Sequence, residues 1–266
     1  MKRIVGAVMV TAALTAPALA ADLGARSYTK APALAPVRNW SGFYIGGNLG
    51  YGWRNGNTDF SFLPTPAAFG DNNGSLGIRS TGVIGGAQIG YNWQIGPLVT
   101  GIEADVQGSD IKGSARATAT FFGTAVPDPQ VVPSSETKLA WFGTVRGRLG
   151  VTVTPDLLLY GTGGLAYGRV DASANTHLFV PDGSPFAESP ASVSKTKVGW
   201  TAGAGFEAML PSRWTVGVEY LYVKFDNVST VSTNMIRRGV PLPDNTFRHS
   251  ADLQSNIVRV RLNKLF

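Results

Sequence analysis

The stretch FYIGGNLGYGW, residues 43–53, indicates the fold class of this chain. Every second residue from Phe43 to Trp53 is apolar or glycine, and the residues between them are small or polar apart from Tyr44. Successive side chains of a β-strand point to opposite faces, so this alternation is typical of a strand. The stretch therefore predicts a strand with one apolar face and one small, polar face.

The same two-residue period recurs along the rest of the chain. In the segment 138–151 we place Leu139 and Trp141 on the apolar face and Lys138 on the polar face. We expect seven further strands, at residues 81–93, 98–107, 138–151, 157–168, 197–207, 214–222 and 258–266.

The segment 157–168 differs from the others because both of its faces are apolar or glycine. We interpret four of its side chains as the outward set: Leu157, Leu159, Leu165 and Tyr167.

The connections between these segments indicate the architecture. Three of them are tight turns, at residues 95–97, 154–156 and 210–213. Short turns that alternate with long loops are the layout of an outer-membrane β-barrel, and an even strand number puts both chain ends on the periplasmic side. We therefore predict an all-β fold: an eight-stranded antiparallel transmembrane β-barrel with short periplasmic turns and four long extracellular loops, at roughly 54–79, 110–137, 170–196 and 227–252.

The beginning of the chain reads as an export signal. Lys2 and Arg3 precede an apolar run at residues 4–16, and Ala18 and Ala20 form a small-x-small cleavage site. This is the layout of a secretory signal peptide. We expect three regions: a cleaved signal peptide (1–20), an extended proline-containing tether (21–39) and the barrel (40–266), in the outer membrane of a Gram-negative cell.

Composition narrows the function classes. Charged residues make up 15% of the 266 residues, whereas soluble domains typically carry about 25%. The chain has no cysteine, which excludes disulfides and thiolate metal sites, and no basic run supports nucleic-acid binding. The two histidines, His177 and His249, fall in expected loops and belong to no catalytic or metal motif. We expect no cofactor, no metal site and no enzymatic activity.

The large aromatic residues favour a bilayer. Tryptophan and tyrosine prefer membrane interfaces, where one end of the ring is apolar and the other is wet. A soluble sandwich with aromatic residues in its core explains their position near strand ends less well. We expect eight membrane-interface aromatics: Trp40, Tyr51, Trp53, Trp93, Trp141, Trp200, Trp214 and Tyr222.

The polar faces carry charges of both signs, which would meet inside the barrel. An eight-stranded barrel has an interior just wide enough for its own side chains, so these charges would cross and close it. A charge-lined ion path is the alternative. We predict a luminal ion-pair network of eight residues: Glu103, Asp105, Arg146, Arg148, Glu207, Glu219, Arg259 and Arg261. Lys138 and Lys197 would point inward nearer the outer mouth.

Four segments resemble one protein family. They are WSGFYIGGNLGYG (40–52), TPDLLLYGTGGLAYG (154–168), VEYLYV (218–223) and NIVRVRLNKLF (256–266). Together they are similar to the porin-family outer-membrane proteins of alpha-proteobacteria, of the RopB and hemin-binding types. The resemblance implies a barrel of the OmpA transmembrane type and an assembly signal at the terminal Phe266. Lys264 stands where that family usually has an aromatic residue and Arg261 where it has glycine, so Lys264 weakens the assembly signal or snorkels at the rim.

The function expected from the sequence is an integral outer-membrane protein with an envelope-structural and surface-presenting role. Its expected partners are outer-membrane lipids, lipopolysaccharide, the barrel-assembly machinery and a hemin or surface partner at the loops, with no nucleic acid. Three alternatives remain open: a small-solute porin or hemin-binding outer-membrane protein, a lipid-modifying barrel enzyme, and a soluble periplasmic ligand binder.

Overall fold

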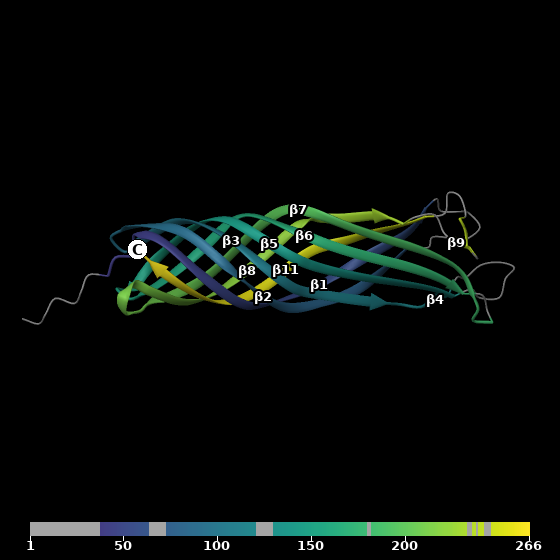
Figure 1. Cartoon of the computed structure of the whole chain (residues 1–266), viewed down its shortest axis with the longest axis horizontal. Helices are drawn as coiled ribbons and strands as arrows, with labels where there is room; N and C mark the ends of the chain where they lie inside the picture. Colours follow the sequence, from purple (N-terminus) through teal and green to yellow (C-terminus); the bar gives the residue numbers. More distant parts are fainter. Residues whose placement is uncertain are drawn as a thin grey trace, which may run out of the picture. The chain divides into compact units, whose positions relative to one another are not determined.

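The computed structural model describes residues 38–63, 73–120, 130–179, 182–232, 236–237, 239–241 and 246–266. The expected signal peptide and most of the expected tether lie outside these residues. Arg38–Phe266 forms one compact unit, built almost entirely of β-strands (Figure 1). No helix long and apolar enough to cross a membrane occurs in the part of the chain that the structure describes.

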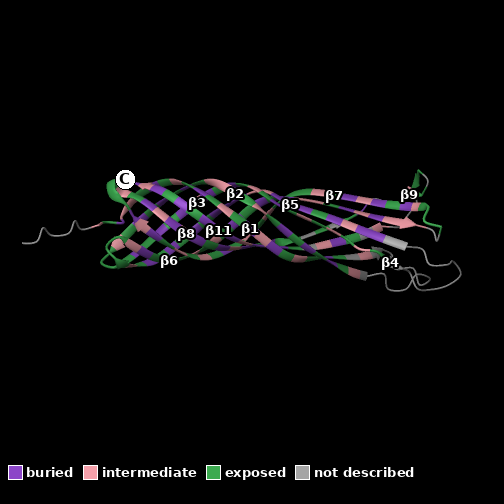
Figure 2. Cartoon of the chain, turned by 90° about the horizontal axis from the view of Figure 1, so that it is seen from below, coloured by how far each residue is buried: buried purple, intermediate pink, exposed green. Residues whose placement is uncertain are grey.

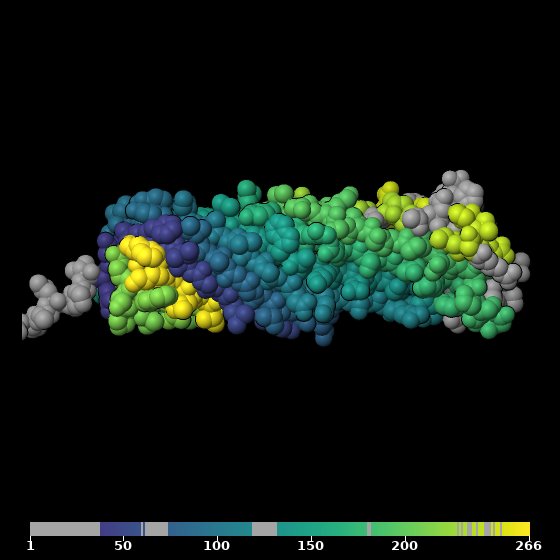
Figure 3. Space-filling view, in the orientation of Figure 1, coloured from purple at the N-terminus to yellow at the C-terminus, as the bar shows by residue number. Residues whose placement is uncertain are grey.

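Eight long antiparallel strands form a closed ring. Consecutive strands pair with each other, β1 pairs with β11, and β7 pairs with β8 (Figure 3 shows the first strand in purple beside the last in yellow). The ring strands are β1 (Gly42–Leu63), β2 (Asn73–Ile95), β3 (Leu98–Arg116), β5 (Gln130–Thr154), β6 (Leu157–Phe179), β7 (Pro185–Met209), β8 (Trp214–Val231) and β11 (Thr246–Leu265).

Three two-residue strands and one short helix complete the described elements. The strands are β4 (Ala119–Thr120), β9 (Ile236–Arg237) and β10 (Val240–Pro241), and the 3₁₀-helix η1 spans Pro211–Arg213. The expected tight turns are confirmed at residues 96–97, at residues 155–156 and at η1. We call the end of the ring with these turns the short-turn end, and the opposite end the outer end.

The two-residue period of the sequence is confirmed as two faces of the wall. Leu49, Val83 and Leu149 are each more than half exposed on the outside, at 65%, 56% and 59%. Along each strand, the residues that alternate with these outward positions point inward and are buried or half-buried. This alternation produces the bands of colour in Figure 2. The outward interpretation of the segment 157–168 is also confirmed, because Leu159 and Leu165 are exposed while the intervening inward side chains are not. Apolar residues therefore cover the outside of the ring, which contradicts a soluble sandwich with an aromatic core.

The expected extent of the four long loops is wrong. Strands β6 and β7, for example, stay paired from Leu157↔Ala208 to Phe179↔Pro185, so almost all of the expected loop 170–196 is strand. Outside a membrane neither face of a strand needs to be apolar. The alternation of apolar and polar residues therefore stops there, although the backbone hydrogen bonds between the strands continue. His177 and His249 accordingly lie in β6 and β11, not in loops.

A β-bulge overturns the expected facing at the outer part of β5. The register with β6 shifts between Leu139 and Trp141, and an extra residue on one strand exchanges its two faces. Leu139 is therefore buried inside the barrel, and Lys138 is exposed on the outside instead of pointing inward. Lys197 is half-buried and donates from Nζ to the carbonyl of Asn227 at 2.9 Å.

Trp40 is not a membrane-interface residue. Its side chain is fully buried, and its indole Nε1 donates to the carbonyl of Pro155 at 3.2 Å. Trp40 precedes β1, so the strand alternation does not fix its direction, and the ring lies inside the barrel at the short-turn end. There it belongs to an apolar layer that also contains Tyr44, Val99, Leu158, Tyr160, Met209 and Leu265.

Candidate functional site

The eight charged residues predicted for the lumen all point inward and are almost completely buried. Strand alternation places them, since most occur as pairs two positions apart on one strand. They are Glu103 and Asp105 on β3, Arg146 and Arg148 on β5, Glu207 on β7, Glu219 on β8, and Arg259 and Arg261 on β11. We call this set the ionic layer.

Glu219 is the centre of the ionic layer, because three arginines converge on its carboxylate. Arg146 donates from Nη1 at 3.0 Å and Arg261 donates from Nη1 at 3.0 Å, both to Oε1. Arg259 donates from Nε to Oε2 at 2.7 Å. These donors come from β5 and β11, so the contacts tie opposite parts of the wall together across the lumen.

Glu103 and Asp105 complete the same cluster from β3. Arg146 and Arg259 each donate from Nη2 to Oδ2 of Asp105 at 3.0 Å. Glu103 accepts hydrogen bonds from Arg146 and Arg261. Hydrogen bonds between guanidinium and carboxylate are stronger than neutral ones, and each charge here has partners of the opposite sign.

Arg148 is paired with an acid from a different strand than those that bind Arg146 from β3. Its ion pair is with Glu207 on β7, at 2.9 Å between Nη2 and Oε1. Its guanidinium carbon also lies 3.8 Å from the centre of the Tyr160 ring, a cation–π geometry.

Two tyrosines of the apolar layer around Trp40, which the sequence analysis did not single out, bind the ionic layer through their hydroxyl groups. Tyr44 donates to Oε2 of Glu103 at 2.5 Å. The hydroxyl of Tyr160 donates to Glu219 at 3.2 Å and accepts from Nη1 of Arg261 at 2.9 Å. Both lie on inward positions of their strands, so strand parity was the signal that could have identified them.

Inward glycines on neighbouring strands leave space for the arginine side chains of the ionic layer. Every arginine of the ionic layer lies directly across from an inward glycine: Arg146 from Gly164, Arg148 from Gly101, Arg259 from Gly50 and Arg261 from Gly217. A Cβ on Gly164 would lie only 2.7 Å from the Cα of Arg146, and one on Gly50 only 2.6 Å from the Cβ of Arg259. The large side chains therefore fill space that their cross-strand neighbours leave free.

An apolar layer lies beyond the ionic layer, towards the outer end. Its buried residues are Ile84, Ile111, Leu139, Phe142, Ala166, Val170, Leu221, Val223, Phe225, Leu253 and Ile257. The interior is thus filled at three successive levels by an apolar layer around Trp40, the ionic layer and this second apolar layer.

The predicted interface aromatics other than Trp40 lie on the outside of the wall or are half-buried. Tyr51, Trp93, Trp200 and Trp214 are exposed, and Trp53, Trp141 and Tyr222 are intermediate. Trp141 makes an edge contact with Tyr167, and Trp200 contacts Tyr222. Their contact with a membrane interface remains a prediction.

Phe266 and Lys264 lie at the short-turn end. The backbone N of Phe266 donates to the carbonyl of Phe43 at 2.8 Å, so the last residue extends the seam between the first and last strands. Lys264 donates from Nζ to the carbonyl of Ser212 and lies over the Trp214 ring, as a snorkelling side chain does. The role of Phe266 as an assembly signal remains a prediction.

The described residues contain no group of three or more His, Cys, Asp or Glu side chains arranged to hold a metal ion. His249 is buried near the outer end, and burial lowers its pKa because the charged imidazolium is disfavoured there. The expectation that His249 lies in a loop is wrong, because this residue is part of β11.

Comparison with known proteins identifies the family. A family model described as an outer membrane protein β-barrel domain matches residues 7–241. The chain belongs to this family. The expected resemblance to alpha-proteobacterial outer-membrane proteins and the expected location in the outer membrane are thereby confirmed.

Relatives within the family span nearly the whole chain. The 31 kDa outer-membrane immunogenic protein of Brucella melitensis is 38% identical over 263 residues, which cover 97% of each chain. The 22 kDa outer membrane protein of Rhizobium leguminosarum is 32% identical over 72% of this chain and 67% of its own length. Among solved structures, the outer membrane protein OprG of Pseudomonas aeruginosa matches with a TM-score of 0.48 and 11% identity, covering 85% of this chain and 97% of that one.

Proposed function

We propose that this outer-membrane barrel is a closed structural element of the envelope and not a pore or an enzyme. The observation that carries the proposal is the ionic layer, in which four arginines and four carboxylates cross the lumen and bind each other. A buried charge without a partner is costly, and this layer balances its charges. Water or a solute could pass only if these ion pairs separated.

The arrangement gives no support to a hydrolytic or lipid-modifying site in the lumen. Each carboxylate of the ionic layer binds at least one guanidinium, so these groups are committed to ion pairs. General acid–base catalysis needs a carboxyl or imidazole that can reach a substrate and exchange a proton with it. The inward acids are therefore structural in this proposal.

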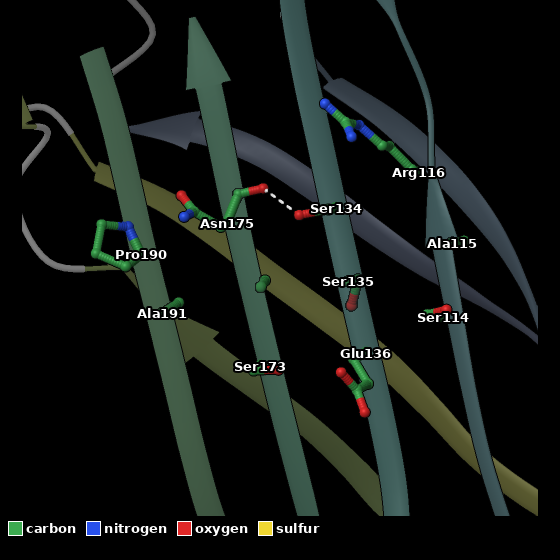
Figure 4. A pocket seen from close by; sticks show the side chains of 11 residues that line it. Ser114, Ala115, Arg116, Ser134, Ser135, Glu136, Ser173, Asn175, Pro190 and Ala191 are labelled. Atoms are coloured by element: carbon green, nitrogen blue, oxygen red, sulfur yellow. Dashed lines mark hydrogen bonds between the residues drawn. The ribbon is translucent and has the colours of Figure 1, made fainter.

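The outer part of the wall suits a surface-presenting role. Its strands continue well past the aromatic residues and carry serine, threonine and small side chains on both faces. A hollow of about 430 Å³, lined by both polar and small apolar residues, crosses β3, β5, β6 and β7 there, and Figure 4 shows Ser134, Asn175 and Arg116 among its side chains. In this proposal lipopolysaccharide and external partners meet this polar surface.

Planar-bilayer recording of the purified barrel tests the closed lumen. We expect no steady single-channel current for the native protein, because the ion pairs fill the cross-section. A wide porin inserted under the same conditions is the positive control for the recording. Large, stable conductance steps from this chain would refute the proposal and favour the small-solute porin alternative.

A further inference from the structure

Charge is segregated between the two faces of the wall at its outer part. Arg54 on β1 occupies an inward register position there and is buried. The described carboxylates of the same region occupy outward positions: Asp59, Asp110, Glu136, Asp171, Glu188, Asp226 and Asp252. Arg54 is therefore a buried cation on the inner face, whereas the described acids of this region lie on the outer face. We call the described interior beyond the apolar layer, with Arg54, Thr58, Ser80 and Thr137, the outer vestibule.

Arg54 is buried in the outer vestibule without an acceptor for two of its nitrogens. Its exposed fraction is 5%, and neither Nε nor Nη2 has a hydrogen-bond partner. The guanidinium lies over Gly56, since a Cβ on that glycine would be 3.0 Å from Nε and 3.4 Å from Nη2. Asp252, the acid that acts on Arg54 electrostatically, has an exposed side chain. Each arginine of the ionic layer, in contrast, has a carboxylate partner.

Three residues with hydroxyl groups occupy inward positions on β1, β2 and β5 in this part of the barrel. Ser80 lies directly across from Arg54 on β2, and Thr58 is two inward positions further along β1. Thr137 lies on β5 opposite Gly113, on the far side of β3 from β2. The hydroxyl oxygens of all three are buried without a hydrogen-bond partner.

This donor set has a definite chemical preference. A guanidinium offers a planar fork of N–H donors that matches two oxygens of a phosphate, and hydroxyls can donate to the remaining oxygens. No described carboxylate occupies an inward position of the vestibule, and Asp252, which acts on Arg54 electrostatically, is exposed.

We propose that the outer vestibule is a binding site for a phosphate-bearing anion, with Arg54 as its anchor. The anion is inorganic phosphate or the phosphate group of a small phosphomonoester. The filled apolar and ionic layers below stop its passage, so the site holds the anion at the outer end. This inference stands independently of the structural role proposed above, because it concerns only the part of the interior beyond the apolar layer.

Titration calorimetry with inorganic phosphate, in detergent micelles and a chloride buffer, tests the site. We expect saturable binding to the native barrel and at least tenfold weaker binding to Arg54→Gln. Arg79→Gln is the matched control, since Arg79 is exposed on the outer face of the neighbouring strand, and its affinity should equal that of the native barrel. Absence of phosphate binding in this buffer, or equal binding to Arg54→Gln, would overturn the proposal.

Thermal unfolding provides a readout that does not depend on a loss of binding. Without phosphate, Arg54→Met should unfold at a higher temperature than the native barrel, because it removes a buried charge that lacks a partner. Phosphate should raise the midpoint of the native barrel and leave that of Arg54→Met unchanged. An equal rise in both proteins would contradict binding at Arg54. Heat-modifiable migration on a gel confirms that each variant is folded before it is measured.

Discussion

Replacing Glu219 with glutamine is expected to destabilise the barrel by about 3–5 kcal/mol, the cost of removing one partner from a buried ion pair. The effect is large because Arg146, Arg259 and Arg261 all donate to this carboxylate. A neutral amide keeps the volume but leaves three buried guanidinium groups with less negative charge. Urea unfolding of the barrel in lipid, followed by heat-modifiable migration, measures the loss.

Two further variants separate the ion pairs from a general effect of losing charge. Glu188→Gln removes an exposed acid near the outer end of β7 and should change the free energy of unfolding by less than about 0.5 kcal/mol. A double-mutant cycle of Glu219→Gln with Arg259→Gln should give a coupling energy of about 1–3 kcal/mol. Additive single effects would show that the two groups do not depend on each other, against the geometry described here.

Gly164→Ala is expected to cost about 3 kcal/mol or to prevent folding, because the inward side of this position has no space for a methyl group. A Cβ there would lie 2.1 Å from the carbonyl oxygen of Val145, which is backbone and cannot move without displacing Arg146. The yield of heat-modifiable barrel after refolding, and its urea midpoint, measure the effect.

The neighbouring glycine supplies the matched control. Gly163 faces outward on the same strand, and a Cβ there would lie 3.7 Å from the carbonyl oxygen of Thr201, an ordinary contact. Gly163→Ala should therefore fold with the native yield and a similar midpoint. Equal damage from both substitutions would mean that β6 requires glycine for its backbone and not for the space across from Arg146.

The sequence predicts the ring well because side chains along a barrel strand point alternately to the outside and to the inside. Within the apolar belt, strand parity alone assigns Leu49 to the outside and Glu103, Arg146 and Glu219 to the inside, as the structure has them. The position of a glycine directly across from each luminal arginine can be predicted only once the register between the strands is known.

Three errors have distinct physical causes. Leu139 points inward and not outward because a β-bulge inserts one residue between it and Trp141. No residue type in that segment predicts the bulge. Trp40 lies inside because it precedes the first strand and takes its direction from packing against the short-turn layer. The strands were expected to end near Arg54 and Val170 because the apolar pattern fades outside a membrane, whereas backbone pairing does not depend on it.

The sequence did not predict the outer vestibule around Arg54, because the apolar pattern fades before the strand ends. Arg54 immediately follows the last outward aromatic of its strand and was assigned to a loop. Only the continuation of β1 to Leu63 places its side chain inside the ring, across from Ser80.

Spin-label accessibility tests most directly whether the apolar face meets lipid and the charged face meets itself. The chain has no cysteine, so single labels can be placed at Leu49, Leu149 or Leu165 on the outer face and at Lys112 near the outer end as an aqueous reference. In liposomes, labels at the three leucines should collide frequently with oxygen and rarely with a water-soluble nickel chelate, and the label at Lys112 should show the reverse. Leucine labels that the nickel chelate reaches as readily as Lys112 would contradict the account.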